Sequence, residues 1–212
     1  MKNLNPVPGT RHEGPPNPFG LTGMDHAALA VADVDRAVRF YEEALGGRAY
    51  YATGFGDPPH DVGAPGYPRR SEEGGAPRFR GDPAEAGRTP HVFMHVGTVL
   101  LQVGYPNDGR TFADRHSQSH WPHVAFGASA AVLDRMCGHL RAMGVPFSGP
   151  RSHPPVDAVS IYFKDPDGNK LEVCTWDPYP VERTEPLGPG HGLDWEALNH
   201  DWRPAPAAAG AE

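Results

Sequence analysis

The sequence predicts an α+β fold built from two modules, each running strand–helix–strand–strand–strand. The prediction rests on an internal repeat. Residues 23–46, GMDHAALAVADVDRAVRFYEEALG, are echoed about a hundred residues later by residues 120–144, HWPHVAFGASAAVLDRMCGHLRAMG. In both copies a histidine opens a short apolar strand, and an amphipathic helix follows and ends at glycine. Such a repeat determines the architecture more firmly than any single motif does.

The first module is expected over residues 23–105. Its elements are a strand at 24–31, a helix at 33–46, a strand at 48–53 and a hairpin at 91–105 that turns near Gly97 and Thr98. Asp33 or Asp35 can cap the helix, and Gly46 can end it. Residues 54–90 form a polar insert whose length is typical of functional or disordered loops. We expect this insert to form an irregular cover near the site.

The second module is expected over residues 121–176. Its elements are strands at 121–127, 145–149, 157–163 and 169–176 and a helix at 129–143. The remaining segments are an extended arm at 1–22, a linker at 106–120 and a Pro- and Ala-rich tail at 177–212, with one helical turn near 193–199. A five-residue loop at 165–169 would pair Lys164 with Lys170. That register places Tyr162 across from Glu172 on the same face, whereas a four-residue loop would turn Tyr162 away.

Charge and composition exclude several classes of protein. The net charge of −7 argues against nucleic acid and anionic membrane surfaces as partners. The two cysteines, Cys137 and Cys174, do not make a disulfide framework. No apolar run approaches the roughly 18 residues that span a bilayer, and the N-terminus lacks the apolar core of a signal peptide. From these observations we expect a cytoplasmic protein.

Three residues on expected strands form the candidate site: His26, His123 and Glu172. Taken singly, a strand histidine is more often a hydrogen-bonded core or edge residue, and Glu172 could lie on an edge strand facing water. However, the two histidines occupy equivalent positions of the repeat, and Glu172 interrupts an apolar strand. A carboxylate there is costly unless it is paired or bound to a metal.

The chain resembles the vicinal-oxygen-chelate superfamily, which includes glyoxalase I, the fosfomycin-resistance transferases and the extradiol ring-cleaving dioxygenases. The segments DHAALAVADVDRAVRFYEEALGG, WPHVAF and SIYFKDPDGNKLEV carry the resemblance, which covers about 25–53 and 91–176. It implies that the two modules curl into an open half-barrel around a divalent metal, with His26, His123 and Glu172 as ligands.

Two imidazoles and one carboxylate match the ligand set of non-haem Fe(II) oxygenases, which leaves three positions open. We therefore take an Fe(II) dioxygenase that cleaves a small catechol as the leading prediction. Gln102 occupies the position where glyoxalases carry an acid. Since an amide is a poor base, this counts against glyoxalase chemistry. Ala28 and residues 149–159 depart from the Thr and the potassium loop of the fosfomycin branch.

Two alternatives stay open: a Mn(II)- or Zn(II)-dependent isomerase or thiol transferase, and a non-catalytic protein that binds a small molecule such as a drug. In the dioxygenase and fosfomycin branches, a Tyr at the spacing of Tyr162 points at the metal-bound substrate. Ring-cleaving enzymes also use a histidine as acid–base, for which His116, His120 and, if the insert closes, His60 are candidates. The modules pair within one chain or by exchange in a homodimer.

Overall fold

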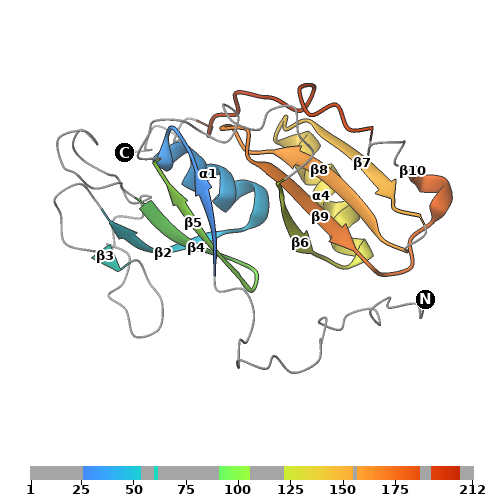
Figure 1. Cartoon of the computed structure of the whole chain (residues 1–212), viewed down its shortest axis with the longest axis horizontal. Helices are drawn as coiled ribbons and strands as arrows, with labels where there is room; N and C mark the ends of the chain where they lie inside the picture. Colours follow the sequence, from blue (N-terminus) through green and yellow to red (C-terminus); the bar gives the residue numbers. More distant parts are fainter. Residues whose placement is uncertain are drawn as a thin grey trace, which may run out of the picture. The chain divides into compact units, whose positions relative to one another are not determined.

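The computed structural model describes residues 26–53, 60–61, 91–105, 122–154, 157–186 and 192–205. These residues fall into two compact units. The N-terminal unit comprises the described residues of 26–105, the turn Asp165–Asn169 and residues 201–205, and the C-terminal unit comprises the described residues of 122–164 and 170–200. Each unit contains one open mixed sheet, which confirms the predicted α+β class (Figure 1).

The sheet of the N-terminal unit, sheet A, has the strand order β1–β5–β4–β2–β3. The strands are β1 (His26–Ala30), β2 (Arg48–Thr53), β3 (His60–Asp61), β4 (His91–Val96) and β5 (Val99–Gly104). β1 runs parallel to β5, and the other pairs are antiparallel. The helix α1 (Val34–Leu45) begins at Asp33, whose carboxylate accepts from the Arg36 backbone N–H, and ends at Gly46 in the left-handed conformation. The predicted cap and stop are therefore confirmed.

The apolar side of α1 packs on one face of sheet A. The buried residues there are Val34, Ala37, Val38, Phe40, Tyr41, Val92, Met94, Leu101 and Val103. Side chains alternate between faces along a strand, so the opposite face carries His26, Phe93 and Gln102. The rings of His26 and Phe93 meet edge to face there, with centroids 5.7 Å apart.

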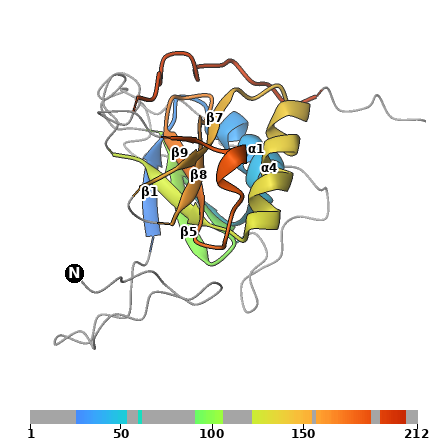
Figure 2. The ribbon, with the colours of Figure 1, turned by 90° about the vertical axis from the view of Figure 1, so that its right-hand side faces the viewer.

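The sheet of the C-terminal unit, sheet B, has the order β10–β7–β8–β9–β6. The strands are β6 (Val124–Gly127), β7 (Phe147–Ser152), β8 (Val159–Lys164), β9 (Lys170–Thr175) and β10 (Glu185–Pro186), and the helix α4 spans Ala130–Ala142. Figure 2 shows α4 lying along one side of this sheet. Leu133, Cys137 and Leu140 of α4 are buried, as the amphipathic pattern predicts.

The sequence missed three details of the C-terminal unit. β7 runs to Ser152, because pairing with β8 resumes at Arg151 after an irregularity that follows Ser148. The tail adds the 3-10 helix η1 (Val181–Arg183) and the edge strand β10. The helical turn expected near 193–199 is a hydrogen-bonded turn without helix, in which Leu198 N–H donates to the Trp195 carbonyl.

The internal repeat extends to the register of the strands. In sheet A, Ala28, two residues after His26, pairs with Gln102 of β5. In sheet B, Ala125, two residues after His123, pairs with Glu172 of β9. Gln102 and Glu172 are therefore equivalent residues, and each lies on the same face of its sheet as the histidine of its own copy.

A buried aspartate organises the loop between β8 and β9, which has five residues, one of the two lengths that the sequence left open, and pairs Lys164 with Lys170. Asp165 accepts from the backbone N–H groups of Asp167 and Asn169, and from the Tyr41 hydroxyl at 2.8 Å. Burial raises the pKa of Asp165 to about 6.

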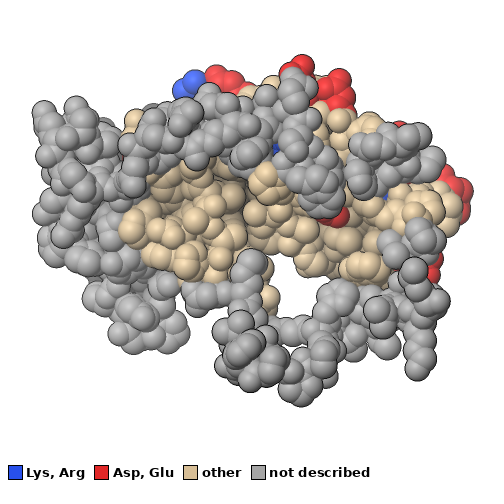
Figure 3. Space-filling view, in the orientation of Figure 1, with Lys and Arg blue, Asp and Glu red and all other residues tan. Residues whose placement is uncertain are grey.

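In the described residues no helix is both long and apolar enough to cross a bilayer. The described surface in the view of Figure 3 is largely uncharged.

Candidate functional site

A histidine and a carboxylate meet on the face of sheet B opposite α4, which we call the site face. His123 precedes β6, and Glu172 lies on the neighbouring strand β9. His123 Nε2 lies 2.8 Å from Glu172 Oε2. The structure therefore brings together two of the three predicted metal ligands within one unit.

Glu172 is buried but keeps a charged carboxylate. The Ser160 hydroxyl on β8 donates to Oε1 at 2.5 Å, while His123 contacts Oε2. Burial alone would raise the pKa of Glu172, but the hydrogen bonds from His123 and Ser160 outweigh it and hold the pKa below its ordinary value. The site thus presents a fixed anion beside an imidazole.

Tyr162 lies across from Glu172, as the five-residue loop requires. Its hydroxyl is 3.2 Å from His153 Nε2, and either group can donate, depending on the histidine tautomer. Burial, together with the charge of Glu172, raises the pKa of Tyr162 well above its ordinary value. The phenol therefore stays protonated at neutral pH and acts as a hydrogen-bond donor rather than a base.

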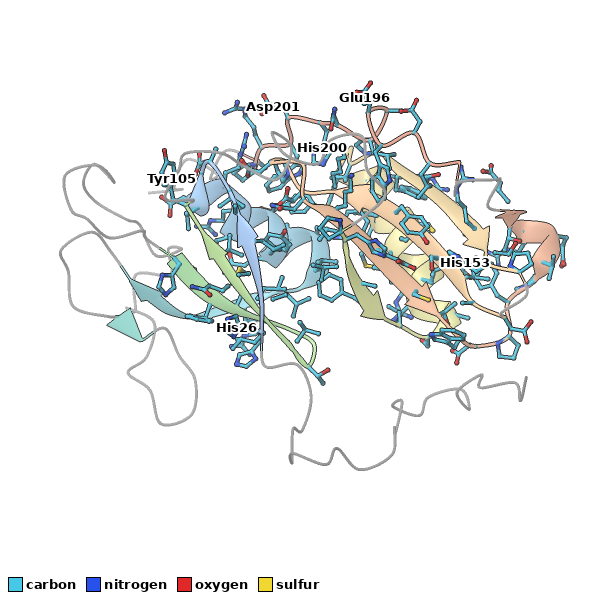
Figure 4. The ribbon with its side chains drawn as sticks, viewed as in Figure 1. His26, Tyr105, His153, Glu196, His200 and Asp201 are labelled. Carbon is cyan, nitrogen blue, oxygen red and sulfur yellow. The ribbon has the colours of Figure 1, made fainter. Side chains whose placement is uncertain are left out.

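Sequence reasoning missed Ser160 and His153 as site residues. Ser160 could have been found, because it precedes Tyr162 by two residues on one strand and alternation puts both on one face. His153 follows β7, and only the folding of the β7–β8 connection brings it to Tyr162. Figure 4 labels His153 on this unit.

Two paired lysines lie at one end of the site face, and both Lys164 and Lys170 are only 1% exposed. Burial, followed by the charge of Lys164, lowers the pKa of Lys170 from 10.5 to about 8. Between about pH 8 and 10.5 the unfolded chain binds a proton at this residue that the folded chain has lost. The contribution of Lys170 to the free energy of unfolding therefore increases as pH rises through this range, because the cost of burying a charged lysine is gradually lost.

We expect Lys170→Met to remove this contribution. The free energy of unfolding, measured by urea titration from pH 7 to 10.5, should rise less with pH in the variant than in the wild type. Subtracting the free energy of unfolding of the variant from that of the wild type at each pH removes the contribution of groups that titrate alike in both proteins. Parallel pH curves would contradict the lowered pKa.

The third predicted ligand, His26, belongs to the N-terminal unit, at the start of β1 (Figure 4). Within the described residues, no group of three His, Cys, Asp or Glu residues is placed to hold a metal ion. The 2.8 Å spacing of His123 Nε2 and Glu172 Oε2 is close to that of two neighbouring ligands of an octahedral divalent ion, which lie about 3 Å apart when each is about 2.1 Å from the ion. The role of His26 as the third ligand stays a prediction.

Of the three predicted acid–base histidines, the structure describes only His60. His116 and His120 lie outside the described residues, as does most of the insert. His60 lies on β3, the edge of sheet A farthest from β1. At about 4.8 Å per strand spacing, roughly 19 Å separates the two edge strands. The catalytic roles of these three residues, and the cover formed by the insert, remain predictions.

The model of the Glyoxalase/Bleomycin resistance protein/Dioxygenase superfamily matches residues 23–173, which is most of the chain. The chain belongs to this superfamily. The match begins just before the strand of His26 and ends just after Glu172, so it includes both copies of the repeat. The resemblance inferred from the sequence motifs is therefore confirmed.

A curated relative is the metallothiol transferase FosB of Shouchella clausii, 24% identical over 156 residues that cover 73% of this chain and 81% of the relative. A solved domain of the same superfamily from Frankia sp. EAN1pec is 20% identical with a TM-score of 0.51, covering 76% of this chain and 96% of that domain. The fosfomycin resistance protein FosX of Listeria monocytogenes is 17% identical with a TM-score of 0.50, covering 72% and 92%.

These structural likenesses establish the fold of the chain. The curated relative is named a metallothiol transferase, so the comparisons support a metalloenzyme of this superfamily and agree with the thiol-transferase alternative. They support neither iron nor the ring-cleaving reaction that the sequence analysis placed first.

Proposed function

We propose that the protein is a metal-dependent enzyme that transfers a small thiol to a small electrophile bound through its oxygen atoms. The observation that carries this proposal is the contact of His123 with a charged, buried Glu172 beside Tyr162. Among relatives, the metallothiol transferase supports the reaction type. Ala28 and the sequence of the β7–β8 connection still depart from the fosfomycin branch, so the electrophile need not be fosfomycin itself.

In this proposal His26, His123 and Glu172 hold one divalent ion, with Mn(II) or Zn(II) ahead of Fe(II). Imidazole nitrogen and carboxylate oxygen are ligands that all three ions accept. When bound there, the ion would supply a Lewis acid that polarises the oxygen atoms of the substrate. Ser160 holds the carboxylate of Glu172 in one orientation through its hydrogen bond, which is the usual function of a residue behind a metal ligand.

Tyr162 and His153 supply proton transfer in the proposed reaction. The Tyr162 phenol, protonated at neutral pH, can donate a hydrogen bond to a substrate oxygen that gains negative charge. As the thiol sulfur bonds to carbon and the carbon–oxygen bond breaks, the thiol loses one proton to solvent and the substrate oxygen gains one from the phenol. His153 Nε2 is within reach of the Tyr162 hydroxyl and can return that proton to the phenol. The pair therefore acts as a short relay beside Glu172.

The test incubates the full chain, loaded separately with Mn(II) and Zn(II), with fosfomycin and with cysteine or glutathione as the thiol. Phosphorus NMR detects thiol adducts of this phosphonate epoxide. We expect an adduct, and we expect His153→Gln to slow its formation about 100-fold while the bound metal is retained. His139→Gln, an exposed histidine on α4, is the matched control and should react like the wild type. A wild type that holds no divalent metal would contradict the proposal.

Ring-cleaving oxygenation remains the second candidate, because His153 lies where an acid–base histidine could serve a catechol bound beside Tyr162. An oxygen electrode separates the two reactions. Fe(II)-loaded protein that consumes dioxygen with a small catechol, while the thiol assays give no adduct, would favour the second candidate.

A further inference from the structure

A segment of the tail covers part of the site face. Within residues 192–200, which we call the C-terminal segment, Trp195 is 4% exposed and Leu198 is 5% exposed. Both belong to one apolar cluster with Tyr162, to which Leu193 adds a partly buried side chain. The indole of Trp195 meets the Tyr162 ring edge to face, with centroids 5.8 Å apart and planes at 84°.

Polar contacts hold the C-terminal segment on the β8–β9 hairpin. Lys164 Nζ donates to Asn199 Oδ1 at 2.6 Å, and His200 Nε2 donates to the Lys164 carbonyl oxygen at 2.9 Å. Lys170 Nζ lies 5.2 Å from the centre of the Trp195 ring, within the range of a cation–π contact. These contacts make the segment a fixed part of the C-terminal unit.

The two sides of the C-terminal segment differ in character. Asp194 and Glu196 flank Trp195 and are exposed, while Trp195 itself turns inward. Glu196 and His200 can be located in Figure 4, and acidic side chains lie along the corresponding edge of the surface in Figure 3. This alternation buries one large aromatic side chain against Tyr162, a residue of the proposed site.

We propose that Trp195 is a specificity-determining residue that limits the size of the ligand on the site face. Tyr162 pairs directly with Glu172, and its ring lies 6.3 Å from that of His123. The Trp195 indole therefore occupies space next to the residues that would surround a bound ligand. This inference rests on the proposed function, because it assumes that ligands bind at His123 and Glu172.

The test measures ligand size directly, with hydroxamates that chelate a divalent ion through two oxygen atoms. Mn(II)-loaded full chain is titrated calorimetrically with acetohydroxamate, which is small, and with 2-naphthohydroxamate, whose ring system is close to an indole in size. The quantity compared is the affinity for the naphthyl probe divided by the affinity for acetohydroxamate. We expect this ratio to be at least 10-fold higher in Trp195→Ala than in the wild type, because the naphthyl group fills the volume that the indole leaves.

Trp202→Ala is the matched control. Trp202 lies in the same tail, is 9% exposed, and packs edge to face on Phe40 of the N-terminal unit rather than on Tyr162. In Trp202→Ala the ratio of the affinities for the naphthyl probe and acetohydroxamate should equal the ratio in the wild type. If Trp195→Ala does not fold, Trp195→Phe with benzohydroxamate makes the same test with a smaller gap.

The outcomes separate the two proposals. A wild type that binds acetohydroxamate, with affinity ratios equal in Trp195→Ala and Trp202→Ala, would overturn the role of Trp195 and leave the proposed function standing. A wild type that holds no Mn(II) and binds neither probe would overturn both. A changed ratio in Trp195→Ala alone supports the specificity role.

Discussion

Replacing Glu172 by Gln is expected to lower the affinity of the protein for Mn(II) by about 100-fold or more. The substitution keeps the size of the side chain but removes the anionic charge among the proposed ligands. Loss of residues that merely orient a metal ligand costs roughly 10- to 100-fold in affinity, so loss of a charged ligand should cost at least as much. Titration of apo protein with Mn(II), followed by the paramagnetic resonance of the free ion, measures this affinity.

Glu185→Gln is the matched control for this measurement. Glu185 also lies in sheet B, on β10, but its carboxylate is 72% exposed and pairs with Arg151. Its substitution should leave the Mn(II) affinity unchanged. A second variant, Ser160→Ala, should lose about 10-fold, because it frees the Glu172 carboxylate without removing it. Glu172→Gln that binds Mn(II) like the wild type would refute the proposed ligand set.

Local rules reduced the register of β8 on β9 to two alternatives that the sequence alone could state. The sequence offered a five-residue and a four-residue loop before Lys170, and strict alternation then gave the side of Tyr162 for each; the structure has the five-residue loop, which places Tyr162 beside Glu172. The repeat likewise indicated that the two histidines occupy equivalent positions, and the family resemblance added Glu172 as their partner. Strand periodicity and a count of residues therefore give the alternatives, and the pairing of the strands selects one of them.

The remaining features of the site depend on contacts between segments that no local pattern relates. His153 reaches Tyr162 through the path of the β7–β8 connection, and Trp195 reaches it from a tail that the sequence left without a role. The two tryptophans of the Pro- and Ala-rich tail, Trp195 and Trp202, stand outside any periodic pattern that would indicate their burial. The irregularity in β7 was missed for the same reason, since pairing that resumes at Arg151 depends on the neighbouring strand.

That irregularity gives the prediction with the largest expected effect on stability: Gly149→Ala should lower the free energy of unfolding by about 3 kcal/mol or more. Gly149 has a φ of 114°, which disfavours any side chain. A Cβ atom there would lie 2.6 Å from the Ser160 carbonyl oxygen and 3.0 Å from the Arg151 nitrogen. Backbone strain of this kind costs about 1–3 kcal/mol, and steric overpacking adds a similar amount.

Gly144→Ala separates the two causes. Gly144 also has a positive φ, of 70°, but an added Cβ meets nothing within 4 Å. Its variant should therefore lose only the energy of placing a side chain in the left-handed region, about 1–2 kcal/mol, and urea unfolding of the two variants measures the difference. Since the clash at Gly149 is with Ser160, whose hydroxyl orients Glu172, Gly149→Ala should also weaken Mn(II) binding, whereas Gly144→Ala should not. Equal losses of stability in the two variants would contradict the close approach of β7 to β8 at this point.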